Sequence, residues 1–261
     1  MTGAGRPPTP GHAADENVTT DAWLGGKLSL LQPAKGYRVA IDAALLAAAT
    51  PLAPGGHALE LGAGVGAAAL ALAWRVQGAH VDGIELQPSL AALARRNAEA
   101  NRLADRVEFI EADIRRLPKL AQPYDEALFN PPYLRPEAND ASPDPIRRIA
   151  TVEGPARLDD WMKAAVAAVR PGGGVTLIHR ADRLADILAA AANAGLGGLT
   201  VWPVWPRRDA DAHRIIVRGR AGKGGRLRLA AGLVLHRENG QFTEAAAALL
   251  EGAALEHLAR A

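Results

Sequence analysis

Residues 57–66 read His57-Ala-Leu-Glu60-Leu-Gly62-Ala-Gly64-Val-Gly66, an apolar run that ends in a glycine-rich turn. The apolar residues 57–61 predict a buried strand, and the alanine-rich residues 66–76 predict a helix that starts at the turn. Glycines let the backbone approach a ligand closely, and the amino end of a helix attracts negative charge. The turn therefore predicts a binding site at the end of the strand, and by itself it also fits a dinucleotide-binding pattern.

The same alternation continues on both sides of this unit. Further strands are predicted at residues 81–86, 107–110, 124–129 and 175–179. Helices are predicted at residues 40–49, 88–101, 158–169 and 183–192. Strands that alternate with helices in this way indicate a parallel sheet with helices on both faces.

The two ends of the chain follow different patterns. Residues 199–204 and 214–217 are strand-like runs joined by a polar link, so we expect them to pair antiparallel. Residues 227–235 predict another strand, and residues 243–258 predict a helix capped by a threonine. Residues 21–31 hold two apolar runs around a Gly-Gly pair and predict a small hairpin. The expected fold is thus α/β, with a doubly wound, seven-stranded, mostly parallel sheet and an antiparallel hairpin near the carboxyl end.

Composition narrows the class of protein. The chain has 261 residues, no cysteine and a formal net charge of +2, so disulfides, thiolate metal sites and cysteine nucleophiles are excluded. Residues 1–16 are polar and rich in glycine and proline, and we expect a disordered tail before a single domain at residues 17–261. There is no apolar run of about 18 residues that could span a membrane. The seven histidines show no ligand spacing, so we expect no metal partner. Without a membrane span or an apolar signal core near residues 1–16, we expect a cytoplasmic protein with no membrane partner.

Two acidic residues lie at the carboxyl ends of the next two predicted strands. Glu85 ends one of them, where an acidic side chain can accept hydrogen bonds from both hydroxyls of a ribose. Asp113 follows the other, where a carboxylate can accept a hydrogen bond from an adenine amino group. Together they predict an adenosine-containing ligand, either a nicotinamide cofactor or S-adenosylmethionine.

Asn130-Pro131-Pro132-Tyr133 directly follows the predicted strand at 124–129, at the end of the sheet where ligands collect in such folds. A planar NH2 group is a poor nucleophile because its lone pair is delocalised. The Asn130 side-chain oxygen and the Pro131 carbonyl can accept its two hydrogens and localise the lone pair, and the prolines keep these acceptors rigid. Tyr133 offers a ring face on which a planar group can stack. The motif predicts methyl transfer to such an amine by proximity, without a strong base.

In the order of these motifs, residues 35–220 resemble the class I S-adenosylmethionine-dependent methyltransferases that carry Asn-Pro-Pro-Tyr on a Rossmann-like fold. Within that class the chain is most similar to the bacterial tRNA adenine-N(6) methyltransferase family, which modifies the adenine beside the anticodon of a valine tRNA. Three more stretches resemble that family, at residues 32–46, 147–150 and 240–245.

The resemblance implies S-adenosyl-L-methionine as the cofactor and tRNA as the partner. It implies that the target amine is held by Asn130, Pro131, Pro132 and Tyr133. It assigns the cofactor to Glu60, Gly62, Gly64, Gly66, Glu85, Leu86, Asp113, Ile114, Tyr37, Arg38 and Asp42.

Residues 207–228 carry eight basic and two acidic residues. The basic ones are Arg207, Arg208, Arg214, Arg218, Arg220, Lys223, Arg226 and Arg228. Such an excess suits a phosphate-binding face, so we expect this stretch to contact tRNA. The alternative is a solvated hairpin whose arginines pair with nearby carboxylates.

Three other functions stay open at this point. Release-factor glutamine methyltransferases share Asn-Pro-Pro-Tyr, because a glutamine amide presents a similar planar NH2, but they typically carry a helical N-terminal domain. Only 61 residues precede Gly62 here. A non-catalytic RNA-binding protein has no need of Asn130, and a nicotinamide dehydrogenase leaves residues 130–133 unexplained. The fold alone does not decide among these functions.

Overall fold

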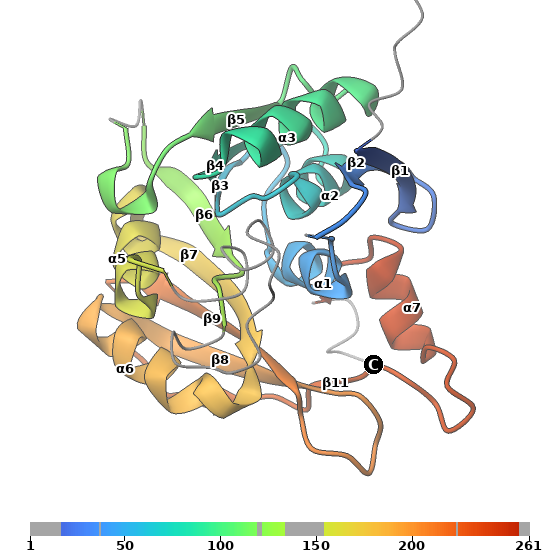
Figure 1. The fold of residues 1–261 in the computed structure, drawn as a ribbon. Helices are drawn as coiled ribbons and strands as arrows, with labels where there is room; N and C mark the ends of the chain where they lie inside the picture. The colour runs from blue at the N-terminus through green and yellow to red at the C-terminus, as the bar shows by residue number, and fades with distance from the viewer. Residues whose placement is uncertain (1–16, 37, 119–121, 134–153, 223, 256–261) are drawn as a thin grey trace, which may run out of the picture.

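A single large sheet organises the chain (Figure 1). The computed structural model describes residues 17–36, 38–118, 122–133, 154–222 and 224–255. The sheet has the order β10-β8-β9-β7-β6-β3-β4-β5, with β11 also paired to β8. Its longer strands are β3 (His57–Leu61), β4 (His80–Glu85), β5 (Val107–Glu111), β6 (Tyr124–Phe129), β7 (Val169–Arg180), β8 (Leu196–Trp205) and β9 (Arg214–Ala221). These seven strands confirm the predicted doubly wound sheet.

Strand direction follows the prediction as well. β9 is antiparallel to both β7 and β8, whereas β3 to β7 run parallel to one another. The chain moves outward from β3 to β4 and β5, then returns to place β6 on the other side of β3. This reversal is a topological switch point, and ligands bind in the crevice outside the carboxyl ends of the strands there.

Helices cover both faces of the sheet (Figure 1). One face carries α1 (Ile41–Ala49), α2 (Ala67–Arg75) and α3 (Pro88–Ala100), and α7 (Glu244–Leu250) lies outside α1. The other face carries α5 (Leu158–Ala168) and α6 (Leu184–Asn193). Residues 67–73 of α2 are all buried. All seven are alanine or leucine, so the helix packs closely against the sheet.

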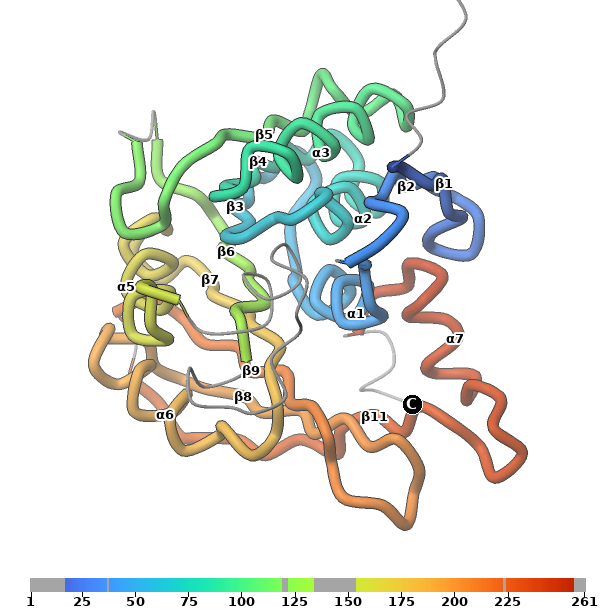
Figure 2. Tube along the Cα trace, in the orientation of Figure 1, coloured from blue at the N-terminus to red at the C-terminus, as the bar shows by residue number. Residues whose placement is uncertain are grey.

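The side chains of Asn97 and Asn101 fix the N-terminal hairpin to α3. It consists of β1 (Val18–Trp23) and β2 (Leu28–Pro33), and Figure 2 shows it beside α2 and α3. The Asn97 side chain accepts a hydrogen bond from Leu31 N–H at 2.7 Å and donates to the carbonyls of Leu31 and Val65. Asn97 therefore joins the hairpin to the glycine-rich turn that precedes α2.

Two predictions about the last third of the chain are wrong. Residues 227–235 form two short strands, β10 (Arg228–Leu229) and β11 (Leu233–Val234), instead of one. Gly232 interrupts them at φ +80°, where a Cβ would collide with the Pro203 carbonyl. The last helix is capped by Thr243 as predicted, but α7 ends at Leu250, close to Gly252 at φ +98°. A residue with positive φ cannot continue a right-handed helix.

Smaller differences concern β7 and the segments outside the description. β7 starts at Val169, before the predicted strand at 175–179, so it includes Gly172–Gly174. Gly174 is needed inside the strand, because a Cβ there would collide with the Glu126 carboxylate. The expected tail at residues 1–16 and the stretch at 147–150 lie outside the described residues. Two 3-10 turns, η1 (Ile114–Arg116) and η2 (Ala181–Arg183), complete the described elements.

Candidate active site

A cavity of about 610 Å³ opens at the carboxyl ends of β3, β4 and β6. This volume lies within the range of small-molecule and cofactor sites, roughly 300–1,000 Å³. Nine of the predicted site residues line it: Glu60, Gly62, Gly64, Glu85, Leu86, Asp113, Ile114, Asn130 and Pro132. The structure thus brings together residues that are spread over 73 positions of the chain.

The glycine-rich turn forms one wall of the cavity. Gly62 and Gly64 have φ values of +70° and +58°, which side chains other than glycine rarely adopt. A Cβ on Gly62 would lie 2.5 Å from the Trp161 ring, which lines the same cavity. Gly66 is outside the lining, and its missing Cβ instead leaves room for the Phe109 ring. Gly66 is therefore required by packing, not by contact with the cavity.

Glu85 connects this turn to the end of β4. Its Oε2 accepts a hydrogen bond from Gly64 N–H and its Oε1 accepts one from Gln87 N–H, both at 2.8 Å. Burial raises the pKa of Glu85, while these backbone hydrogen bonds lower it. Each oxygen keeps a further lone pair for a donor in the cavity, as two ribose hydroxyls require.

Glu60 is the most deeply buried acidic group of the site. Its Oε2 accepts a 2.8 Å hydrogen bond from Ala69 N–H in the first turn of α2. Burial, with a smaller contribution from the Glu85 charge, raises the pKa of Glu60 to about 8. At neutral pH this carboxyl is therefore mostly protonated, so Glu60 adds a hydrogen-bond donor to the cavity without adding a second negative charge beside Glu85.

Asp113 lies across the cavity with its carboxylate bound to Arg115. The Arg115 Nη2–Asp113 Oδ2 distance is 2.6 Å, and Arg115 N–H donates to Oδ1 at 2.9 Å. These contacts hold the pKa of Asp113 below its ordinary value. Asp113 thus stays ionised at neutral pH, and an amino group that binds to it shares the carboxylate with Arg115.

Asn130 stands at the point where β6 ends. The preceding residue, Phe129, pairs with Leu61 of β3 and Leu177 of β7, so the segment that follows it emerges between two parallel strands. Asn130 is exposed, and its side chain forms no hydrogen bond with the part of the chain that the structure describes. Pro131 is buried and Pro132 lines the cavity. An anchored backbone with an accessible amide oxygen is the arrangement expected for holding an NH2 group.

Comparison with known proteins identifies the family. A model of the methyltransferase domain matches residues 58–154. The tRNA1(Val) (adenine(37)-N6)-methyltransferase of Aeromonas hydrophila is 30% identical over 208 residues, which are 79% of this chain and 86% of that protein. The chain belongs to this methyltransferase family. Its cofactor is S-adenosyl-L-methionine, as the sequence predicts.

Two other similarities describe how far the likeness extends. The crystal structure of a predicted O-methyltransferase from Agrobacterium tumefaciens superposes with a TM-score of 0.68 and 29% identity, covering 82% of this chain and 97% of that one. The release factor glutamine methyltransferase of Chlorobaculum tepidum is 32% identical over 139 residues, 49% of this chain and 47% of that protein. The first confirms a methyltransferase fold, and the second spans only about half of each chain.

The cavity of this methyltransferase fits the cofactor. Gly62 and Gly64 line the cavity with backbone atoms, and Glu85 keeps acceptor capacity where a ribose is expected. When bound, S-adenosyl-L-methionine supplies an electrophilic methyl group on a sulfonium. Trp161, with Ala43 and Leu46 of α1, adds apolar lining that the sequence analysis missed, because nothing in their local sequence marks them.

Three residues that the sequence assigns to the cofactor of the methyltransferase are placed elsewhere or not described. Arg38 lies against the N-terminal hairpin, with its Nη2 2.6 Å from Asp21 Oδ2, and it does not line the cavity. Asp42 is in the first turn of α1, but its Oδ2 lies 3.0 Å from Arg214 Nε. Tyr37 lies outside the described residues.

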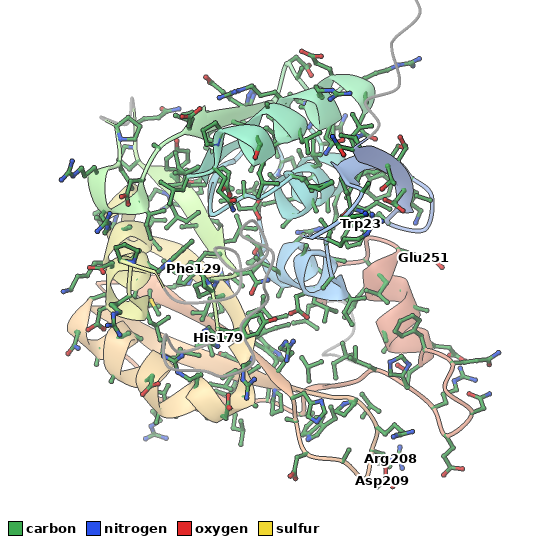
Figure 3. All side chains as sticks on the ribbon, in the orientation of Figure 1. Trp23, Phe129, His179, Arg208, Asp209 and Glu251 are labelled. Atoms are coloured by element: carbon green, nitrogen blue, oxygen red, sulfur yellow. The ribbon has the colours of Figure 1, made fainter. Side chains whose placement is uncertain are left out.

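The predicted basic face of the methyltransferase is divided by the fold. Arg214 pairs with Arg180 at the carboxyl end of β7, whereas Arg220 pairs with Gly174 toward the opposite edge of the sheet. Arg218 lies between them, with its side chain 15% exposed and its Nη2 2.9 Å from Glu126 Oε1, which fits the alternative of arginines that pair with nearby carboxylates. Arg207 and Arg208 are exposed on the loop after β8, where Figure 3 labels Arg208. Lys223 lies outside the described residues.

None of the described histidines lines the cavity. His179, labelled beside Phe129 in Figure 3, is buried on β7, and its Nδ1 accepts a 2.8 Å hydrogen bond from Arg180 N–H. Burial and the nearby Arg183 charge lower the pKa of His179 to about 4, so the ring is neutral at physiological pH. Among the described residues there is no group of three or more histidine or acidic side chains that could hold a metal ion. None of the described helices is long and apolar enough to cross a membrane.

Proposed function

We propose that the protein transfers the methyl group of S-adenosyl-L-methionine to the exocyclic amine of an adenine in tRNA. The observation that carries this proposal is the exposed Asn130 amide on the wall of the cavity, anchored by the buried Pro131 and by the end of β6. The name of the Aeromonas relative designates adenine 37 of tRNA1(Val), and we extend that substrate to this chain. Action on tRNA would place the protein in the cytoplasm.

The proposed chemistry depends on two acceptors and one ring. Asn130 Oδ1 and the Pro131 carbonyl accept the two hydrogens of the adenine NH2, so that the nitrogen lone pair points toward the methyl group. The nitrogen forms a bond to the methyl carbon while the carbon–sulfur bond breaks, and the sulfur would keep that electron pair as a neutral thioether. The nitrogen then releases one of its two protons to water. Because the backbone that carries both acceptors is anchored at the end of β6, little reorganisation is needed in the transition state. Tyr133 stacks on the adenine and holds the amine in line.

The proposed cofactor contacts follow from the lining of the cavity. Glu85 accepts hydrogen bonds from the ribose hydroxyls, and Asp113 accepts one from the adenine of the cofactor. The turn at Gly62 and Gly64 faces the methionine part, and Leu86 and Ile114 pack against the purine. These roles are supported by the position of each residue on the cavity wall.

A glutamine amide in a release factor is the second candidate substrate. It presents the same planar NH2 to Asn130, and the Chlorobaculum enzyme shares part of its sequence with this chain. The tRNA assignment is favoured because the similarity to the Aeromonas enzyme extends over 79% of the chain rather than 49%.

One experiment separates the two candidates. The purified protein is incubated with methyl-labelled S-adenosyl-L-methionine and either unmodified total tRNA or a release factor, and the digested products are identified by mass spectrometry. We expect N(6)-methyladenosine from the tRNA reaction and no label in the protein. Methylglutamine without methyladenosine would replace the proposal with the second candidate, and label in neither would refute both.

A further inference from the structure

The ring of Tyr133 is covered on one side by a cation. The guanidinium carbon of Arg214 lies 5.7 Å from the centre of the Tyr133 ring. This is within the distance of about 6 Å at which a cation over an aromatic face is attracted to it. Arg214 is the first residue of β9, and its register with Arg180 brings it to the edge of the sheet where the segment 130–133 begins.

Arg214 is itself fixed by an acidic residue from the other end of the chain. Its Nε lies 3.0 Å from Asp42 Oδ2, and its Nη1 donates to the His213 carbonyl at 3.2 Å. The Asp42 side chain is only 13% exposed and that of Arg214 is 32% exposed, so water screens this pair less than a surface pair. A guanidinium with two such contacts has little freedom to leave the ring.

Asp42 also ties this contact to the cofactor cavity. It lies in the first turn of α1, and Ala43 and Leu46 of the same helix line the cavity. Two contacts in series therefore connect α1 to the Asn-Pro-Pro-Tyr segment. Asp42 holds Arg214, and Arg214 lies over the Tyr133 ring. The backbone of Tyr133 has a separate contact, because Arg183 Nη1 donates to its carbonyl at 3.4 Å.

We infer that Arg214, held by Asp42, is a positioning residue that orients the Tyr133 ring for the substrate. With one face of the ring occupied by the guanidinium, the planar amine-bearing group of the substrate stacks on the opposite face. The inference rests on the proposed function of residues 130–133. It adds a role for two residues, one of which the sequence assigns to the cofactor and the other to a tRNA surface.

The test is a double-mutant cycle between Arg214 and Tyr133. Arg214→Gln should lower kcat/KM for the substrate about five- to thirtyfold, in the range of a partly buried cation–π contact. In a Tyr133→Ala background the same change should cost less than about twofold, because its target is gone. Asp42→Asn should reproduce part of the loss, and Arg214→Lys, which keeps the charge without the planar group, should fall between Arg214→Gln and the wild type.

A binding signal separates positioning from a general effect on the fold. RNA with 2-aminopurine at the target adenine loses fluorescence when that base stacks, and Arg214→Gln should weaken this quenching while the calorimetric affinity for S-adenosyl-L-methionine stays unchanged. The control is Arg237→Gln, which removes an exposed arginine–glutamate pair at α7 and should leave kinetics and quenching unchanged.

The possible results separate a failure of this inference from a failure of the proposed function. Equal losses from Arg214→Gln in the wild-type and Tyr133→Ala backgrounds would show that Arg214 does not act through Tyr133, and would overturn the inference while leaving the proposed function intact. If the wild type methylates a release factor instead of tRNA, the same cycle is measured on that substrate. A wild type that methylates neither would overturn the proposed function and this inference together.

Discussion

The backbone N–H of Gly64 donates a 2.8 Å hydrogen bond to Oε2 of Glu85, so the glycine turn and the end of the neighbouring strand form one unit. Because each of them fixes the position of the other, a ligand that contacts one depends on the placement of both. The acidic side chain shapes the turn and keeps acceptor capacity for the cavity, which ties the folding of this corner to cofactor binding.

The first prediction concerns this carboxylate. Glu85→Gln replaces one charged acceptor oxygen by an NH2 group, so we expect cofactor affinity to fall about ten- to hundredfold, or about 1.5–3 kcal/mol for a charged hydrogen bond. Isothermal titration with S-adenosyl-L-methionine measures it. The matched control is Glu111→Gln, because Glu111 is the register partner of Glu85 on β5 but is exposed. Unchanged affinity in Glu85→Gln would remove Glu85 from the ribose site.

The second prediction concerns the pH dependence of stability. Burial raises the pKa of Glu60 from 4.5 to about 8, so the folded protein keeps a proton that the unfolded chain releases between these values. The stabilising contribution of this proton to the free energy of unfolding is fully present below pH 4.5 and is lost as the pH rises through about 8. Between pH 6 and 9 the wild type should lose about 2–3 kcal/mol of unfolding free energy that Glu60→Gln does not lose.

Urea denaturation of both proteins at several pH values measures the difference. The exposed Glu108 on β5 provides the control, because Glu108→Gln should follow the wild-type curve. Parallel pH profiles for the wild type and Glu60→Gln would mean that Glu60 does not hold its proton in the folded state.

The third prediction concerns the amide at the end of β6. Asn130→Ala removes one of the two proposed acceptors, so methyl transfer should fall by a factor of about one hundred or more, as when a preorganised hydrogen-bonding group is deleted. Affinity for S-adenosyl-L-methionine should change little. Single-turnover assays and calorimetry measure the two quantities separately, with the exposed Asn239→Ala as the control. Normal turnover in Asn130→Ala would exclude the mechanism proposed above.

The sequence predicts this fold well because its signals are local. The alternation of apolar strands with helices predicts a parallel sheet with helices on both faces. Gly62 and Asn130 each follow directly after a strand, and Glu85 ends one. The carboxyl ends of parallel strands meet at one edge, so their assembly around one cavity could be expected from the chain order alone. The same reasoning could not find Trp161, which reaches the cavity from a helix on the other side of the switch point.

Pairings between distant residues are what the sequence could not reveal. A count of charges treats residues 207–228 as one basic surface, but Arg214 and Arg218 lie four positions apart along β9 and so meet different partners. Their partners, Asp42 and Glu126, are 172 and 92 positions away, and no local pattern marks either contact. The short interruption at Gly232 was missed for a similar reason, because it is imposed by the Pro203 carbonyl on a neighbouring strand.

The last prediction separates folding from RNA binding within the basic stretch. Arg218→Gln leaves the buried Glu126 carboxylate without the guanidinium that hydrogen-bonds to it, and one oxygen of that carboxylate already has no hydrogen-bond partner among the described residues. We expect a loss of about 3 kcal/mol in unfolding free energy, in the range for breaking a buried pair from one side. The exposed Arg207 and Arg208 should behave in the opposite way. Changing both to glutamine should leave stability within about 0.5 kcal/mol.

The salt dependence of tRNA binding distinguishes the paired Arg218 from the exposed Arg207 and Arg208. Each phosphate contact adds about one unit to the slope of the logarithm of the affinity against the logarithm of the salt concentration. The double variant at positions 207 and 208 should therefore lower the slope by about one to two units, whereas Arg218→Gln should keep the wild-type slope at temperatures where it is folded. A reduced slope in Arg218→Gln, with full folding verified by circular dichroism, would return Arg218 to the RNA surface, since a buried guanidinium paired with Glu126 releases no counterions when tRNA binds.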